Sequence, residues 1–257
     1  MAFPDTAAPF TVVIPARMGS TRFPGKMLAV LGGQTVLART FRQACQSRAE
    51  QVLIATDHPD IAAEASRIGA TAVLTDPSLP SGTDRTAAAL AQLPHPPARV
   101  VNVQGDEPFI DPAHINAVGE MLAAGAVIAT LAIPVQAPEE LSNPNTVQVV
   151  LGRAGQALYF SRWPIPYPRA TGGAADLSVY PYLRHVGIYG FQTEALRAVV
   201  ALPPSPLELA ESLEQLRWLE AGYPVQVRQV AGTGMGIDTP ADLAAAEAWL
   251  AAQPSLG

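Results

Sequence analysis

A short segment near the start of the chain carries three cations and two glycines that together could bind a polyphosphate. Lys26 is the only lysine among the 16 basic residues, and Arg17 and Arg22 precede it without an intervening acid, although the chain's formal net charge is −6. A lysine offers a compact ammonium on a flexible stem, where arginine offers a planar fork. Gly19 and Gly25 would allow left-handed backbone and close approach, so that amide N–H groups join the cations. The segment therefore predicts an anion site on an acidic protein.

Two aspartates follow predicted strands and could hold Mg²⁺ beside the bound phosphates. Asp106 follows the strand-like run 100–103 after Gln104 and Gly105, and Gly105 would leave room for a ligand. Asp238 follows the run 225–230 through a stretch that contains Gly232, Gly234 and Gly236. Ligands of open α/β sheets bind beyond the carboxyl ends of strands, and Mg²⁺ prefers one or two carboxylates with phosphate oxygens.

Each aspartate also has a purely structural interpretation. Asp238 stands before Thr239-Pro240-Ala241-Asp242, which is typical of a helix start, so its charge could merely favour the helix dipole. Asp106 could simply open a turn.

Three other kinds of site are disfavoured. A P-loop has four residues between its glycines and a hydroxyl after its lysine, whereas Gly19 and Gly25 enclose five residues and Met27 follows Lys26. No G-x-G-x-x-G follows a strand, so a dinucleotide site is unsupported. A zinc site is also disfavoured, because the histidines lack ligand-like spacing: His58, His95, His114 and His185.

The elements that must position these residues follow an alternating pattern. Apolar runs alternate with amphipathic segments, which predicts an open, mostly parallel α/β sheet. Thr11–Ile14 is the first expected strand, and we expect Pro15 to end it because proline lacks an N–H. Further strands are expected at 51–56, 71–74 and 99–103, with helices at about 35–48, 59–68, 84–93 and 112–124.

The rhythm changes from Ala126 onward. Strand-like runs joined by hairpins or long Pro- and Gly-rich connections predict an inserted mixed sheet. Its strands are expected at 126–133, 146–151, 157–161 and 184–191. The alternation then resumes with helices near 193–201 and 206–221, a strand at 224–230 and a last helix from Pro240.

Composition is typical of one ordinary soluble enzyme. The 257 residues can bury a sizeable core, and 49% hydrophobic with only 15% charged residues excludes general disorder. The acidic balance disfavours a nucleic-acid partner, and no apolar run approaches the length of a membrane span. We therefore expect a cytoplasmic protein without a membrane partner. The single cysteine, Cys45, cannot form an internal disulfide and is expected to be buried on a helix face.

The chain resembles the 3-deoxy-manno-octulosonate cytidylyltransferase family, whose members activate the acidic eight-carbon sugar Kdo with CTP. The resemblance runs from about Val12 to Leu243. Eight motifs carry it in order, namely 15–26, Ala55-Thr-Asp57, Ser81-Gly-Thr-Asp-Arg85, 101–108, Tyr159-Phe-Ser-Arg162, Arg184-His-Val-Gly-Ile-Tyr189, Leu213-Glu-Gln-Leu-Arg217 and Gly236-Ile-Asp-Thr-Pro240.

The resemblance implies a role for each candidate residue on the nucleotide side. Arg17 and Lys26 are similar to the family's triphosphate ligands. The residues similar to its cytidine-binding group are Ser81, Arg85 and Gln104. Those similar to its magnesium ligands are Asp106 and Asp238, so Mg²⁺ is the implied cofactor, and Lys26, Arg17, Asp106 and Asp238 form the implied catalytic set.

A second group is similar to the family's pocket for the sugar acid. Its members are Arg162, His185, Tyr189, Glu214 and Gln215. Arg162 would suit a carboxylate, because a guanidinium can meet it bidentately. Glu208, Glu211 and Glu214 are spaced to share one face of the expected helix, so Glu211 could replace Glu214.

The family's known properties give further expectations. They imply a Rossmann-like nucleotide-diphospho-sugar transferase fold in a single domain, 1–257, with an inserted dimerisation subdomain at about 133–191 and a homodimer. The implied reaction is attack of the anomeric hydroxyl of Kdo on the α-phosphorus of CTP, with release of pyrophosphate, in lipopolysaccharide biosynthesis. Two alternatives stay open, which are another 2-keto acid sugar, such as sialic acid or an amino-Kdo analogue, and a catalytically silent nucleotide-binding protein.

Overall fold

The computed structural model describes residues 8–20, 22–143, 145–232 and 235–252, and it divides into two compact units. The first unit comprises Met1–Glu120 with Gly234–Gly257, and the second comprises Met121–Thr233. The second unit contains the expected insertion at 133–191 and extends beyond it on both sides.

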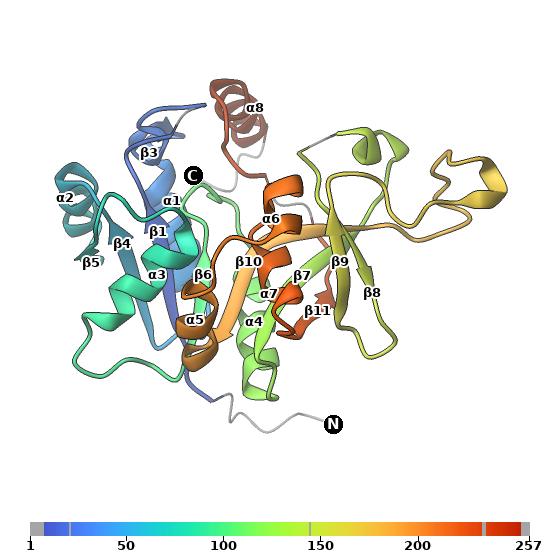
Figure 1. Cartoon of the computed structure of the whole chain (residues 1–257). Coiled ribbons are helices and arrows are strands. Elements are labelled where there is room, and N and C mark those ends of the chain that lie inside the picture. Colours follow the sequence, from blue (N-terminus) through green and yellow to red (C-terminus); the bar gives the residue numbers. More distant parts are fainter. Residues whose placement is uncertain (1–7, 21, 144, 233–234, 253–257) are drawn as a thin grey trace, which may run out of the picture. The chain divides into compact units, whose positions relative to one another are not determined.

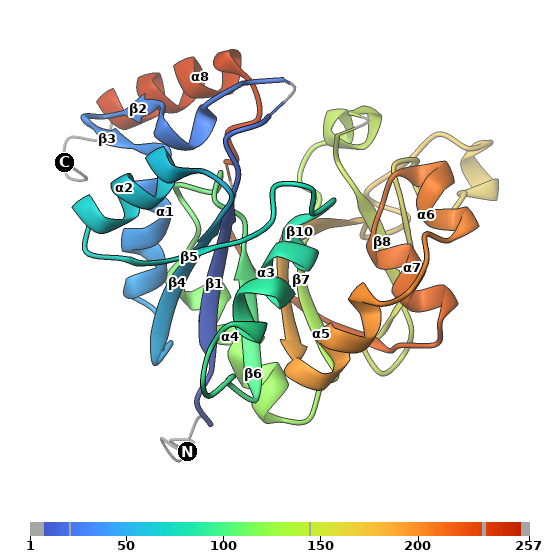
Figure 2. The ribbon, with the colours of Figure 1, turned by 60° about the vertical axis from the view of Figure 1, so that its left-hand side comes forward.

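The first unit is a parallel sheet with helices. Its strand order is β6 (Arg99–Val103), β1 (Thr11–Ala16), β4 (Gln51–Thr56) and β5 (Thr71–Leu74), and every neighbouring pair is parallel. Figures 1 and 2 show α1 and α3 on opposite faces of these strands. The helices of this unit are α1 (Val36–Cys45), α2 (Pro59–Arg67), α3 (Gly82–Ala91), most of α4 (Pro112–Ala123) and α8 (Pro240–Ala251).

Burial and capping explain why these elements form. All six residues of β1 are buried, as a strand covered by helices on both faces requires. Thr35, Ser81 and Thr239 each accept a hydrogen bond from the backbone N–H three residues on, which starts α1, α3 and α8. A short 3-10 helix, η1 (Lys26–Leu28), and a small hairpin, β2 (Val30–Leu31) with β3 (Gln34–Thr35), connect β1 to α1.

The second unit is a mixed sheet with three short helices. Its strand order is β11 (Val225–Gln229), β7 (Ile128–Pro134), β10 (Leu183–Gln192), β8 (Gln148–Leu151) and β9 (Ala157–Ser161). β11 and β7 pair in parallel, whereas the pairs of β7 with β10, β10 with β8 and β8 with β9 are antiparallel. The helices are α5 (Thr193–Val200), α6 (Pro206–Glu211) and α7 (Gln215–Glu220), and two further 3-10 helices are η2 (Pro138–Ser142) and η3 (Arg169–Thr171). Trp218, Phe191 and Phe160 are fully buried and anchor the core.

The predicted alternation of strands and helices is confirmed, with three local corrections. β1 continues through Pro15 to Ala16 rather than ending at Pro15. Its pairing with β4 runs to Ala16, whereas its pairing with β6 ends at Val13, so the N–H that Pro15 lacks is not needed for a bond to β6. The expected helix 206–221 is two helices, since Ser212 adopts a left-handed backbone with φ of 52°. Cys45 is exposed at the end of α1 rather than buried.

The glycines and loop residues singled out in the sequence have different outcomes. Thr21 and Gly234 lie outside the described residues. Gly25 has the expected positive φ of 72°, whereas Gly19 has neither a positive φ nor a neighbouring atom that a side chain would meet. Among the described residues, no helix is long and apolar enough to cross a membrane.

Candidate functional site

The cationic loop lies at the carboxyl end of β1 and closes on itself. The Gly25 N–H donates to the Met18 carbonyl at 3.2 Å, and the Lys26 N–H donates to the Phe23 carbonyl at 3.2 Å. Gly25 caps η1 in a left-handed conformation that few other residues would accept. This closure sends Lys26 inward, where its side chain is only 10% exposed, while Arg17 and Arg22 stay exposed.

Lys26 joins the two predicted metal ligands. Its Nζ donates to Asp106 Oδ2 and, at 3.1 Å, to Asp238 Oδ1. Arg22 pairs with the same Asp238 oxygen at 3.0 Å. Burial lowers the pKa of Lys26, but the carboxylates of Asp106 and Asp238 more than offset this, so its pKa lies above the usual 10.5. The ammonium therefore stays charged at any physiological pH.

Backbone contacts explain how residues so distant in sequence meet. Asp106 lies in a turn after β6, where its own carbonyl accepts the Ile237 N–H at 2.8 Å. That bond ties the segment before α8 to the end of β6. Thr239 and Asp242 form the capping box of α8, whereas the Asp238 carboxylate contacts Lys26 and Arg22. Thr239 therefore caps α8 as expected, while the Asp238 carboxylate is turned toward two cations, and its role as a metal ligand stays a prediction.

Gly105 has a packing role rather than the ligand role expected for it. A Cβ at this position would lie 3.0 Å from both the Met27 Sδ and the Pro15 carbonyl oxygen. The Gly105 carbonyl also accepts the Thr40 hydroxyl at 3.0 Å. Glycine therefore lets β6, β1 and η1 approach closely, and this approach sets the position of Asp106 relative to Lys26.

The expected nucleotide-binding residues lie at the start of α3 and the end of β6. Arg85 is 2% exposed, and its guanidinium donates to Asp57 Oδ2 at 2.9 Å and to Thr75 Oγ1 at 2.6 Å. Ser81 caps α3 and also donates to Asp84 at 2.6 Å. A Cβ on Gly82 would come within 3.1 Å of Pro15 and 3.5 Å of Gln104, so glycine brings the start of α3 close to both.

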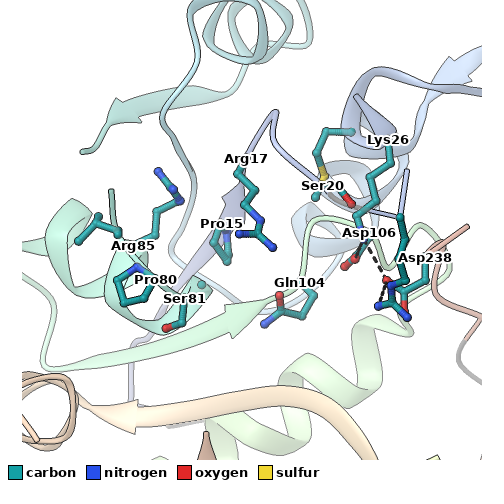
Figure 3. A pocket seen from close by; sticks show the side chains of 14 residues that line it. Pro15, Arg17, Ser20, Lys26, Pro80, Ser81, Arg85, Gln104, Asp106 and Asp238 are labelled. Carbon is teal, nitrogen blue, oxygen red and sulfur yellow. Dashed lines mark hydrogen bonds and ion pairs between the residues drawn. The ribbon is translucent and has the colours of Figure 1, made fainter. Parts of the chain in front are cut away.

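These residues line one cavity of about 240 Å³ within the first unit. Figure 3 shows Arg85, Pro80 and Ser81 on one side, Lys26, Asp106 and Asp238 on the other, and Arg17 and Gln104 between them. All seven nucleotide, catalytic and metal candidates of the first unit therefore meet: Arg17, Lys26, Ser81, Arg85, Gln104, Asp106 and Asp238.

The donors in this cavity fit a magnesium ion that shares its shell with phosphate. Asp106 Oδ2 and Asp238 Oδ1 both contact the Lys26 ammonium, so the two carboxylates lie close together beside this cation. Among the described residues, no cluster of three or more carboxylates, histidines or cysteines could hold a metal by itself. Two hard oxygen donors suit Mg²⁺ bound together with a polyphosphate rather than an all-protein cage.

Sequence reasoning left out several residues of this site. Arg22 counted as a cation but was not a site candidate, Ser20 lines the cavity, and Asp57 orients Arg85. Asp57 could have been found, because it follows β4 as Asp106 follows β6, at the carboxyl end of a parallel strand. Pro80 carried no such signal, because a loop proline rarely indicates a ligand.

The second unit holds the five residues expected to bind the sugar acid. Arg162 follows β9, and its guanidinium donates to the Glu211 carbonyl at 2.7 Å and the Ser212 carbonyl at 3.2 Å. The Glu211 carboxylate in turn accepts the Ser161 hydroxyl at 2.7 Å and the Arg162 N–H at 2.9 Å. Arg162 and Glu211 thus join the end of β9 to the end of α6.

The three glutamates do not share a helix face, contrary to expectation. The left-handed Ser212 ends α6 after Glu211, so Glu214 belongs to the start of α7. Glu208 forms the capping box of α6 with Ser205, and Glu214 pairs with Arg217 at 3.2 Å. Gln215 is buried in the first turn of α7. The roles of these residues toward a sugar stay predictions.

His185 and Tyr189 lie together on β10 within an aromatic cluster. Their ring centroids are 5.2 Å apart, and the rings of Phe160 and Trp218 flank them. Burial, and then the charge of Arg184, lower the pKa of His185 to about 3, so its ring is neutral. Burial and Glu214 raise the pKa of Tyr189 well above its usual value. The buried Tyr189 hydroxyl has no hydrogen-bond partner in the part of the chain that the structure describes.

Comparisons with known proteins agree on one family. The cytidylyltransferase family model matches residues 11–228. A 3-deoxy-manno-octulosonate cytidylyltransferase from Anaeromyxobacter sp. (strain Fw109-5) is 49% identical over 244 residues, which cover 95% of this chain and 97% of that protein. The protein of the same name from Cytophaga hutchinsonii is 43% identical over 90% of this chain and 93% of its own.

Solved structures show the same likeness. A CMP:2-keto-3-deoxy-manno-octonic acid synthetase complexed with CTP superimposes with a TM-score of 0.87 at 37% identity, covering 96% of this chain and all of that one. A 4-diphosphocytidyl-2C-methyl-D-erythritol synthase from Anaerococcus prevotii shares the fold, with a TM-score of 0.62 at 14% identity.

Proposed function

The chain belongs to the 3-deoxy-manno-octulosonate cytidylyltransferase family, and from this we propose that it transfers CMP from CTP to the anomeric hydroxyl of Kdo. The products are CMP-Kdo and pyrophosphate, and the family name implies a role in lipopolysaccharide biosynthesis. The relative solved with CTP, which matches all along its length, supports CTP as the nucleotide.

The single observation that carries the proposal is the cavity in which Lys26 contacts Asp106 and Asp238 while Arg17 lies nearby. Cations at one end suit a triphosphate, whereas the polar groups of Ser81 and Arg85 at the other end, with Gln104 between the two ends, suit a cytidine. An extended nucleotide can therefore lie with its phosphates toward Lys26. Arg17 is exposed and makes no ion pair within the described residues, so its guanidinium is available to an anion.

The chemistry depends on charge neutralisation and positioning. The sugar's anomeric oxygen forms a bond to the α-phosphorus of CTP, the bond from that phosphorus to the bridging oxygen breaks, and the hydroxyl proton passes to solvent. No covalent enzyme intermediate is required, because phosphoryl transfer is catalysed largely by orientation and electrostatics. Arg17 and Lys26 would stabilise the charge that develops on the departing pyrophosphate.

Mg²⁺ is part of the proposal. Asp106 and Asp238 would hold it, and the ion would neutralise phosphate charge and lower the pKa of the attacking hydroxyl. Arg162, His185, Tyr189, Glu214 and Gln215 are proposed to bind the sugar acid in the second unit. The buried Tyr189 hydroxyl supports this, since a buried polar group without a partner is stabilised by a ligand that supplies one.

We further propose a homodimer that works in the cytoplasm, where cells hold CTP. Large apolar side chains lie exposed on β9 and the connection after it, which supports an interface there. They are Leu158, Trp163, Tyr167 and Val179.

Pyrophosphate release tests the reaction directly. The assay uses CTP and Mg²⁺ with Kdo, with sialic acid, with an amino-Kdo analogue or with no sugar, and a further arm replaces CTP by UTP. Release that requires both CTP and Kdo is the expected result. Release with another sugar would identify that sugar as the substrate of the same cytidylyl transfer. CTP binding without release from any sugar would indicate a silent nucleotide-binding protein.

A further inference from the structure

Thr130 lies at an irregularity in the sheet of the second unit, beside one of the proposed sugar-binding residues. The pairing of β10 with β7 shifts between Val186 and Tyr189, so Gly187 and Ile188 bulge out of the ladder. Thr130 faces this bulge from β7 and is fully buried. Bulges are often placed where a strand must re-aim a side chain.

The hydroxyl of Thr130 has three oxygen or nitrogen neighbours but only one proton. Its Oγ1 lies 2.6 Å from the Ile188 carbonyl oxygen, 3.3 Å from the Val186 carbonyl oxygen and 2.9 Å from His185 Nε2. A carbonyl can only accept, so the short contact with Ile188 requires the hydroxyl proton to lie between those two oxygens. The lone pairs of Oγ1 then face His185.

The proton of the imidazole follows from this arrangement. A bare Nε2 at 2.9 Å would oppose the lone pairs of Oγ1, whereas a protonated Nε2 would donate to them. Because the ring is neutral, a proton on Nε2 leaves Nδ1 as an acceptor. Nδ1 has no hydrogen-bond partner in the described residues. It is also not fully buried, because the buried atoms without a partner do not include it. His185 itself is partly exposed.

We propose that Thr130 is a positioning residue, which holds His185 as the Nε2–H tautomer so that Nδ1 accepts a hydrogen bond from a hydroxyl of the sugar substrate. The aromatic neighbours Phe160 and Tyr189 hold the ring on its other sides. A carboxylate has no proton to donate, so His185 selects a hydroxyl, and the acid group of the sugar must be met by a cation elsewhere. The substrate part of this inference rests on the proposed function, whereas the tautomer does not.

The tautomer can be measured in the ligand-free protein by a long-range ¹H–¹⁵N correlation spectrum of the imidazole, assigned with a His185→Gln variant. Wild type and Thr130→Ser should show a protonated Nε2 and a bare Nδ1 at neutral pH. Thr130→Val keeps the shape but lacks the hydroxyl, so the Nδ1–H form should gain population. A wild-type spectrum of the Nδ1–H tautomer or of the imidazolium would overturn the inference, even if no variant folds.

Kinetics then separate positioning from general damage. Thr130→Val should raise the KM for the sugar about tenfold, the effect of one hydrogen bond, with the KM for CTP within about twofold. Thr130→Ser should restore the wild-type KM. In a double variant with His185→Ala, the Thr130 effect should vanish, because the two residues act as one unit. An undiminished effect there, or an unchanged tautomer in Thr130→Val, would refute the positioning role. Absence of turnover with every sugar would refute the proposed function. The tautomer would still be tested by the spectra, because they are recorded on the ligand-free protein.

Discussion

Individual charges in the first unit have different environments, and their contributions should differ accordingly. Lys26 is nearly buried between two carboxylates, whereas the side chain of Arg22 is 54% exposed. A preorganised charge in a partly desolvated site is worth more than an exposed one, because water screens it less.

Removal of the Lys26 ammonium tests this difference. Lys26→Ala should lower turnover about 10² to 10³-fold, the usual effect of losing one preorganised charge stabiliser. Steady-state pyrophosphate release at saturating CTP and Kdo measures it. Arg22→Ala is the matched control and should cost less than about tenfold. Nearly full activity in Lys26→Ala would remove the central argument for the site.

The Asp238 carboxylate should affect the binding of Mg²⁺ rather than the stability of α8. Asp238→Asn removes one of two converging charges, so half-maximal activity should need about tenfold or more Mg²⁺. Asp242→Asn is the nearby control, since Asp242 caps α8. That variant should lose about 0.5–2 kcal/mol of stability and keep the wild-type magnesium titration. The same titration in Asp238→Asn would return Asp238 to a structural role.

His185 should make the protein less stable in acid. The ring has a pKa of about 3 in the folded chain against the usual 6.5, so the unfolded chain binds the extra proton between these values. Stability is therefore fully present above about pH 6.5 and falls as the pH drops toward 3, by at most about 1.4 kcal/mol per pH unit. Urea unfolding at several pH values should show a shallower acid loss for His185→Gln. Identical pH dependence in both proteins would contradict a ring that is neutral in the folded chain.

At the scale of elements, the position of each catalytic group depends on how closely neighbouring elements approach. β6 reaches β1 and η1 at Gly105, and the Ile237–Asp106 backbone bond brings the segment before α8 to the same place. In the second unit, Arg162 and Glu211 join β9 to α6. A substitution that separates two of these elements should therefore shift the side chains of a site, even though all of those side chains are still present.

A methyl group at Gly105 tests this dependence. Gly105→Ala places Cβ about 3.0 Å from the Pro15 carbonyl, which belongs to a central strand and cannot yield freely. We expect a loss of about 1–3 kcal/mol in the free energy of unfolding, measured by urea titration, together with reduced turnover. Gly19→Ala meets no atom within 4 Å and should stay within about 0.5 kcal/mol of wild type. Equal stability of the two variants would show that the strands can separate without cost.

At the scale of the whole molecule, the proposed dimer would cover apolar side chains that lie exposed on β9 and just after it. Leu158 and Trp163 are 59% and 74% exposed in the second unit, on and just after β9.

Sedimentation equilibrium tests the dimer. The wild-type chain should sediment as a dimer, and the double variant Leu158→Asp with Trp163→Asp should sediment as a monomer with an unchanged circular dichroism spectrum. Val30→Asp is the control, because Val30 is also 59% exposed but lies on β2 in the first unit. Dissociation by Val30→Asp, or a monomeric wild type, would contradict the proposed interface.

The order of helices and strands follows from the amino-acid sequence alone, because hydrophobic periodicity and capping residues are local signals. The strands β1, β4, β5 and β6 and the helices between them lie where the pattern predicts them, within a few residues. Two local features differ from the prediction, and each needs the folded structure to explain it. Pro15 is tolerated inside β1 because of which neighbour lies beside it, and Ser212 breaks a periodic helix because of a backbone conformation that no pattern reveals.

How the chemical groups combine depends on long-range contacts in the folded chain. Motif spacing identified Lys26, Asp106 and Asp238 as candidates, but their meeting depends on a backbone bond between residues 106 and 237. The partners of Arg85 and the proton on His185 were equally hidden, since hydrogen-bond geometry depends on distances across the sheet and not on separation along the chain. Local propensity therefore specifies which elements form, and long-range packing specifies which side chains share a site.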